Sequence, residues 1–84
     1  MEEQFIIILS SPTCPPCKTL KAFLSSNGVK FKDVDVRNPE QKEEVEQLKA
    51  ISKSRMVPQV FKKEGANIEY LFSGFNPEKA KTLL

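Results

Sequence analysis

The chain has 84 residues, of which 39% are hydrophobic and 29% are charged, and its formal net charge is +2. This length and composition predict one globular domain, residues 1–84, with a single modest core, and we expect it to be a monomer. The small net charge excludes a nucleic-acid-binding surface, and the lack of a long apolar run excludes a transmembrane helix, so we expect neither nucleic acid nor membrane as a partner.

The first predicted elements are a strand, a turn and a helix. Residues 5–9 form an unbroken apolar run rich in β-branched side chains, as in a strand that is buried on both faces. A turn over residues 10–13 leads to Cys14 and Cys17, and the helix that follows is closed by Gly28, which suits the left-handed position after the last turn. The apolar stripe of this helix consists of Cys17, Leu20, Phe23 and Leu24.

The middle of the chain predicts a second strand and a second helix. Residues 31–36 alternate in a pattern that favours a strand near a sheet edge, with Asp33 and Asp35 discouraging unwanted edge pairing. The next helix begins at residues 38–40, where an asparagine can cap, a proline suits the first position and a glutamate suits the first turn. It runs to about Ser52 and buries a narrow stripe of Val45, Leu48 and Ile51.

The last third of the chain predicts a hairpin and a short helix. Residues 59–62 and 68–72 are two strand-like runs around a turn with Gly65, and residues 76–78 repeat the Asn-Pro-Glu helix start. The element order is therefore βαβαββα. The first crossover makes two strands parallel and the hairpin adds antiparallel ones, so we expect an α/β fold with a four-stranded mixed sheet and helices on both faces. Such folds place their chemistry where helices start after parallel strands, and Cys14 lies at such a point.

Cys14 and Cys17 are the only cysteines, and two prolines separate them. A disulfide between them would close a very small loop, and because loop-closure stabilisation grows with loop length, reactivity explains the pair better than stability. A Cys-x-x-Cys pair between a strand and a helix is typical of a thioredoxin-like redox motif. Two alternatives stay open: a pair without function, and half a zinc site, which would need carboxylates or a second chain because the chain has no histidine.

The position of each cysteine predicts its role. Cys14 lies at the helix start, where we expect it to be exposed and close to backbone N–H groups, so its thiolate should attack a substrate disulfide. Cys17 lies one turn further along, on the apolar stripe, so it should be buried and should resolve the mixed disulfide.

The compartment also bears on the cysteine pair. Residues 1–4 are acidic where a secretory signal begins with positive charge, and the apolar run that follows is short. We therefore expect a cytoplasmic protein. Cytoplasmic thiols are kept reduced, and a cysteine pair there is more often catalytic than structural.

Three segments resemble the glutaredoxin branch of the thioredoxin superfamily. Residues 12–17, Pro-Thr-Cys-Pro-Pro-Cys, resemble the glutaredoxin active site, and residues 56–61, Met-Val-Pro-Gln-Val-Phe, resemble the family's proline loop. Residues 73–78, Ser-Gly-Phe-Asn-Pro-Glu, are most similar to the Ser-Gly-Phe-Arg-Pro-Asp signature of NrdH-type redoxins. The resemblance implies a thioredoxin/glutaredoxin-like fold and a thiol–disulfide oxidoreductase that reduces protein disulfides, with ribonucleotide reductase as one such acceptor.

The resemblance also implies which residues form the site. The catalytic residues would be Cys14 and Cys17, and the substrate-binding residues would be Thr13, Met56, Val57 and Pro58. It further implies a cis peptide bond between Val57 and Pro58, which would turn the Val57 backbone toward the dithiol and offer it to an extended substrate segment.

Departures from the family pattern bear on the electron donor. Ser11 stands where glutathione-using relatives commonly carry a lysine, and residues 73–76 lack their Gly-Gly and following aspartate. We therefore expect the electrons to come from a thioredoxin-reductase-type flavoprotein rather than from glutathione. We also expect the protein to have no tightly bound cofactor. Two alternatives remain: a glutathione-dependent glutaredoxin, and a metal or iron–sulfur module to which two chains each contribute cysteines.

Overall fold

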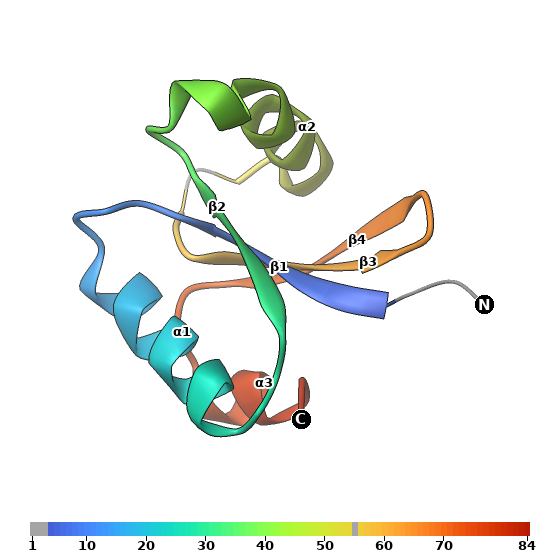
Figure 1. Ribbon diagram of the computed structural model, residues 1–84. Coiled ribbons are helices and arrows are strands. Elements are labelled where there is room, and N and C mark those ends of the chain that lie inside the picture. Colours follow the sequence, from blue (N-terminus) through green and yellow to red (C-terminus); the bar gives the residue numbers. More distant parts are fainter. Residues whose placement is uncertain (1–3, 55) are drawn as a thin grey trace.

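The computed structural model describes residues 4–54 and 56–84 (Figure 1). Residues 1–3, on which the expected lack of a secretory signal partly rests, lie outside the described residues. The element order is the predicted βαβαββα, with one short 3₁₀ turn added before the second helix. In chain order the elements are β1 (Gln4–Ser10), α1 (Pro15–Ser26), β2 (Phe31–Asp35), η1 (Pro39–Gln41), α2 (Lys42–Ser52), β3 (Gln59–Glu64), β4 (Asn67–Ser73) and α3 (Pro77–Lys81).

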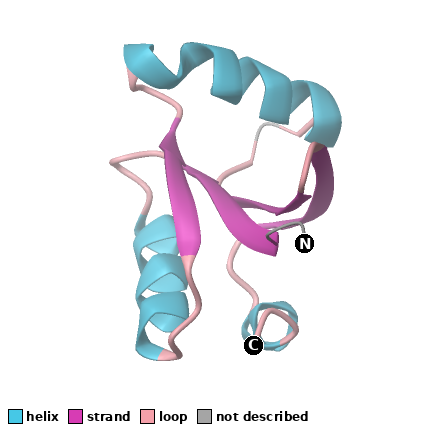
Figure 2. Cartoon of the chain, turned by 45° about the vertical axis from the view of Figure 1, so that its right-hand side comes forward, coloured by secondary structure: helices cyan, strands magenta, loops and turns pink. Residues whose placement is uncertain are grey.

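The four strands form one mixed sheet in the order β2-β1-β3-β4. β1 pairs parallel with β2 and antiparallel with β3, and β3 pairs antiparallel with β4. α1 and α3 cover one face of the sheet and α2 covers the other (Figure 1 and Figure 2). The predicted fold class is confirmed, and β2 holds the edge position that its alternating sequence indicates. None of the helices in the described residues combines the length and the apolar sequence that crossing a membrane requires.

Two apolar clusters, one on each face of the sheet, form the core. The cluster under α2 contains Ile7, Leu9, Val34, Val45, Leu48 and Phe61. The cluster under α1 and α3 contains Ile8, Leu20, Leu24, Val60, Phe72 and Ala80. β1 supplies both clusters, because successive side chains of a strand point to opposite faces and both faces of this strand are covered. This explains its unbroken apolar run.

The local sequence explains where α1 begins and ends. Cys14 has an extended backbone and caps the helix, and Pro15 fills the first helical position, where a backbone N–H has no helical partner. At the other end Asn27 is the C-cap, and Gly28 has a φ of 73°, a left-handed conformation that costs other residues about 1–2 kcal/mol. The buried side chains of the helix belong to the predicted stripe: Cys17, Leu20 and Leu24.

Ile51 departs from its predicted place in the core. The sequence predicts that Val45, Leu48 and Ile51 form a buried stripe on α2, but Ile51 is 37% exposed, and for this residue the prediction is wrong. Val45 and Leu48 pack into the cluster under α2, whereas Ile51 stands in the last turn of the helix, outside that cluster. β3 and β4 are each two residues longer than predicted, because their main-chain pairing continues past the apolar residues, to Glu64 and Asn67 at the turn and to Ser73 at the other end.

Candidate active site

A disulfide joins Cys14 to Cys17, with their Cα atoms 5.2 Å apart. Cys14 follows the carboxyl end of β1 by a short turn, and Cys17 lies in the first turn of α1. The pair therefore stands at the predicted place, and the structure holds it in the oxidised form. Because the loop that this disulfide closes is so short, it adds little to the stability of the fold.

The burial of the two cysteines differs from expectation in one respect. Cys17 is fully buried, as predicted, but Cys14 is only 8% exposed, so the expectation of an exposed Cys14 is wrong for the disulfide form. Its Sγ is bonded to Cys17 on one side and lies 3.7 Å from the carbonyl oxygen of Val57 on the other. Of the two cysteines, Cys14 is still the more exposed, since Cys17 is fully buried.

The start of α1 gives Cys14 one backbone hydrogen-bond donor. The N–H of Cys17 donates to the Cys14 Sγ at 3.2 Å, in the manner of a helix cap. Pro15 and Pro16 occupy the two positions between them and have no N–H to donate. The first turn of the helix carries no acidic residue. The donor and the positive end of the helix dipole both favour a negative charge on this sulfur once the disulfide is reduced.

The proline loop lies against the dithiol. The peptide bond between Val57 and Pro58 is cis, which confirms the prediction, and Pro58 is buried. The carbonyl oxygen of Pro58 accepts a hydrogen bond of 2.7 Å from the N–H of Gly74, which ties the loop to the turn after β4. Met56 is 62% exposed and is the most exposed large apolar side chain of this loop. Gly74 leaves room beside it, since a Cβ built on that glycine would lie 3.8 Å from the Met56 Cε.

Thr13 is exposed in the turn that leads to Cys14. Its backbone N–H donates to the Ser11 Oγ at 3.5 Å, and the two hydroxyl oxygens lie 3.4 Å apart. The N–H of Cys14 in turn donates to the carbonyl oxygen of Ser11 at 3.3 Å. Ser11 therefore shapes this turn through local bonds, and Thr13 is the exposed residue directly before Cys14.

The two lysines of the first half of α1 have different surroundings. Lys18, four residues after Cys14, is exposed. Lys21 pairs with the Asp33 carboxylate at 2.9 Å, and the buried Ser10 donates to the other oxygen of that carboxylate at 2.6 Å. Asp33 therefore connects β1, β2 and α1, beyond the edge-guarding role expected of it. Within residues 4–54 and 56–84 no group of three or more His, Cys, Asp or Glu side chains is placed to hold a metal ion.

The sequence does not predict the buried polar contacts of Gln59 behind the proline loop. The sequence predicts Gln59 only as the first residue of a strand, yet it is fully buried and its side-chain amide bonds to the last residue of α2, Ser52, and to Ser54. The sequence offers one signal for this burial: Gln59 is a polar residue directly followed by the apolar strand residues Val60 and Phe61.

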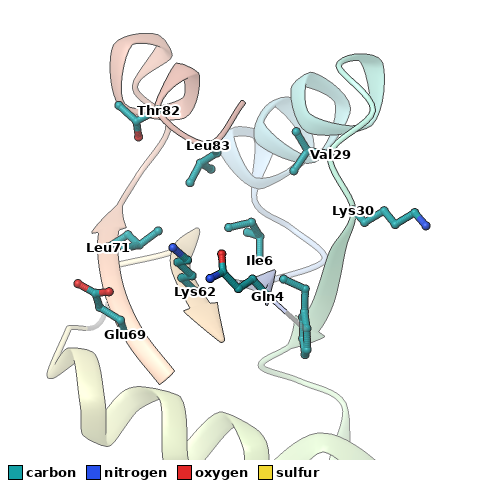
Figure 3. Close-up of a pocket in the computed structure, with 10 residues that line it drawn as sticks. Gln4, Ile6, Val29, Lys30, Lys62, Glu69, Leu71, Thr82 and Leu83 are labelled. Carbon is teal, nitrogen blue, oxygen red and sulfur yellow. The ribbon is translucent and has the colours of Figure 1, made fainter. Parts of the chain in front are cut away.

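A cavity of about 580 Å³ lies away from the dithiol (Figure 3). It opens between the start of β1, the strands β3 and β4, and the residues that follow α3. Its apolar wall includes Ile6, Leu71 and Leu83. The dithiol follows the opposite end of β1, after Ser10. Neither cysteine lines this cavity, so the candidate site consists of the dithiol and the loops around it.

A model of the glutaredoxin family matches residues 6–65, a stretch that contains both cysteines and the proline loop. A glutaredoxin-like 8.6 kDa protein of the rubredoxin operon of Clostridium pasteurianum is 35% identical over 80 residues, which cover 94% of this chain and 96% of that protein.

Two solved structures are similar over nearly the whole chain. The glutaredoxin from Archaeoglobus fulgidus is 32% identical, with a TM-score of 0.68 over 93% of this chain and 83% of the other. The NrdH-redoxin from Escherichia coli, described as a glutaredoxin-like protein with a thioredoxin-like activity profile, is 26% identical, with a TM-score of 0.69 over 94% of this chain and 93% of the other.

Proposed function

We propose that this chain, which belongs to the glutaredoxin family and is a thiol–disulfide oxidoreductase, reduces disulfide bonds of protein substrates with Cys14 and Cys17. The observation that supports this most directly is the disulfide at the helix start, facing the Val57 carbonyl. Peptide backbone beside the reactive sulfur suits a substrate whose disulfide lies in an extended protein segment.

The reaction has two exchange steps. In the reduced protein the Cys14 thiolate attacks one sulfur of the substrate disulfide, forms a mixed disulfide and releases the other substrate sulfur as a thiolate. Cys17 then gives up its proton and attacks the Cys14 sulfur, which restores the internal disulfide and frees the second substrate sulfur. Two electrons pass to the substrate, which leaves as a dithiol after taking up two protons.

The substrate would be held by Thr13, Met56, Val57 and Pro58. The Val57 backbone would meet the main chain of an extended segment, as a strand added at an edge does. Met56 would contribute apolar contact, since its side chain is largely exposed. Thr13 would border the segment on the other side of the dithiol.

The proposed electron donor is a thioredoxin-reductase-type flavoprotein. Residues 73–76 support this choice, because they lack the aspartate that glutathione-using relatives carry. Asn76 stands in its place and uses its side chain to cap α3, accepting from the N–H of Glu78 at 2.9 Å. Ser11 is engaged in its own turn. The thioredoxin-like activity profile of the Escherichia coli relative points the same way. Ribonucleotide reductase is a proposed acceptor because residues 73–78 resemble the signature of NrdH-type redoxins. We place this activity in the cytoplasm, in a monomer without a tightly bound cofactor.

Two coupled assays test the proposal. Oxidised protein is offered a thioredoxin-reductase-type flavoprotein with NADPH, or glutathione with glutathione reductase and NADPH, and in both cases insulin disulfides are the acceptor. We expect clearly faster NADPH consumption with the flavoprotein. Faster turnover with glutathione would assign the protein to the glutathione-dependent branch, and no turnover in either assay would overturn the proposed reduction of protein disulfides. Replacing insulin with ribonucleotide reductase tests the specific acceptor.

A further inference from the structure

Gln59 is a fully buried polar side chain directly behind the proline loop. It is the first residue of β3 and pairs with Leu9 on β1 and with Ser73 on β4, so its backbone is inside the sheet. Burying an amide is unfavourable unless its oxygen and nitrogen both find hydrogen-bond partners. The partners of this amide therefore show what the side chain holds.

Both ends of the Gln59 amide bind the segment that leaves α2. The Ser52 hydroxyl donates to the Gln59 Oε1 at 2.7 Å, and the Gln59 Nε2 donates to the carbonyl oxygen of Ser54 at 2.8 Å. A carbonyl oxygen can only accept, so the nitrogen must face Ser54 and the orientation of the amide is defined. The Ser52 hydroxyl oxygen also accepts from the Ser54 N–H at 3.2 Å. The side chains of Ser52 and Gln59 thus fix the backbone of Ser54, two residues after Ser52.

The hydrogen bonds continue from Ser54 toward the dithiol. The Ser54 Oγ accepts from the backbone N–H of Met56 at 3.2 Å, and the Ser73 hydroxyl donates to it at 3.5 Å. The next residue, Val57, places its carbonyl oxygen 3.7 Å from the Cys14 Sγ. Hydrogen bonds and the main chain together therefore connect the buried Gln59 amide to the Val57 backbone beside the Cys14 sulfur.

We propose that Gln59 is a positioning residue for protein substrates. Its buried amide sets where Met56 and Val57 stand beside Cys14, and thereby prepares the backbone that an extended substrate segment meets. This inference rests on the proposed reduction of protein disulfides. The side-chain hydrogen bonds of Gln59 go to Ser52 and Ser54 and to neither sulfur. We therefore expect Gln59 to act on substrates that have a peptide backbone and to leave the reaction of the dithiol with small disulfides unchanged.

The substitution Gln59→Met tests this role. Methionine has a similar length and volume, so it preserves packing while it removes both hydrogen bonds. Gln47→Met is the matched control, because Gln47 is exposed on α2. Each protein is reduced, freed of reductant and mixed with excess insulin or with the small aromatic disulfide DTNB. Oxidation is followed by the mass added on alkylating the remaining thiols, at increasing concentrations of each disulfide.

We expect Gln59→Met to raise the half-saturating insulin concentration and to lower the efficiency of oxidation by insulin about tenfold, because a small misplacement of positioning groups has a large effect on rate. Its rate with DTNB should stay close to that of the wild type, and Gln47→Met should match the wild type with both disulfides. Unchanged oxidation of Gln59→Met by insulin would overturn the inference. An equal loss with insulin and DTNB would also overturn it, because it would indicate general damage to the site.

A second variant keeps the test decisive if Gln59→Met does not fold. Ser52→Ala removes the donor to the Gln59 Oε1 and the acceptor of the Ser54 N–H, and leaves the bond from Gln59 to the Ser54 carbonyl in place. It should show a smaller loss of the same kind, with insulin and not with DTNB, and the lack of any such difference would refute the inference. If insulin does not oxidise the wild-type protein, the proposed function is overturned as well. If insulin oxidises the wild type and the variants equally fast, only this inference is overturned.

Discussion

The carbonyl oxygen of Val57 lies 3.7 Å from the Sγ of Cys14, although 43 positions separate the two residues in the chain. The sheet produces this contact. Cys14 follows β1, Val57 precedes β3, and the antiparallel pairing of Leu9 with Gln59 brings the two connections to the same end of the central strands. The reactive sulfur is therefore flanked by peptide backbone from a distant part of the sequence.

The proposed function gives the two cysteines different roles, which two variants can test. In Cys17→Ser the Cys14 thiolate should still attack a substrate disulfide, and without a resolving thiol the mixed disulfide should persist. In Cys14→Ser only the fully buried Cys17 remains, so no mixed disulfide should form. Non-reducing electrophoresis and mass spectrometry after incubation with insulin measure the adducts. Equal trapping by both variants would contradict the assignment.

The sequence predicts the parts of the site that depend on local patterns. The cysteine spacing, the cap position of Cys14 and the glycine that closes α1 all follow from neighbours within a few residues, and all are present in the structure. The cis bond before Pro58 has no local cause that the sequence displays, and its prediction depended on the family resemblance. The fold class follows from the element order, because few topologies satisfy it.

The sequence does not predict what depends on contacts between distant segments. Cys14 looks exposed as the residue at a helix start, but its sulfur is bonded to Cys17 and lies 3.7 Å from the carbonyl oxygen of Val57, a residue from a distant segment. Gln59 looks like an ordinary strand residue, because its partners Ser52 and Ser54 stand on the far side of the proline loop. Ile51 continues the apolar stripe of α2 in the sequence. It is nevertheless 37% exposed, because the extent of the core under α2 depends on which distant residues pack against the helix.

Lys53 offers a test of backbone strain. It ends α2 with a φ of 54°, the left-handed conformation that glycine adopts without a steric penalty. Lys53→Gly should therefore stabilise the protein by about 0.5 kcal/mol, the relief of strain exceeding the greater entropy of glycine in the unfolded chain. Lys49→Gly, the same change inside the helix, should destabilise it by about 1 kcal/mol. Urea denaturation measures both, and a destabilising Lys53→Gly would contradict the strain argument.

The bonds of Asp33 should contribute unequally to stability. The Ser10 hydroxyl is buried and donates to the carboxylate at 2.6 Å, so Ser10→Ala should lower the free energy of unfolding by about 1–2 kcal/mol. The pair with Lys21 is partly exposed, so Lys21→Met should lower it by only about 0.5 kcal/mol. Urea denaturation at low and high salt separates them, because salt should weaken only the lysine pair. A larger effect of Lys21→Met would reverse this ranking.

Pro16 limits how many backbone donors reach the Cys14 sulfur. A cap side chain can accept from the N–H groups two and three residues further on, and here the first belongs to Pro16, which has none. Only the N–H of Cys17 donates, at 3.2 Å. Pro16→Tyr should add the missing donor and stabilise the thiolate, because a hydrogen bond to a charged group is worth about 1.5–3 kcal/mol.

We therefore expect iodoacetamide to alkylate Cys14 at pH 7 about three to ten times faster after Pro16→Tyr, since the thiolate is the reacting form. Both proteins are compared in a Cys17→Ser background, so that Cys14 is the only thiol that reacts. Pro15→Ala is the matched control, because it restores an N–H one position too early to reach the cap side chain. An unchanged rate in Pro16→Tyr, or an equal acceleration in Pro15→Ala, would show that the number of backbone donors does not control the reactivity of this cysteine.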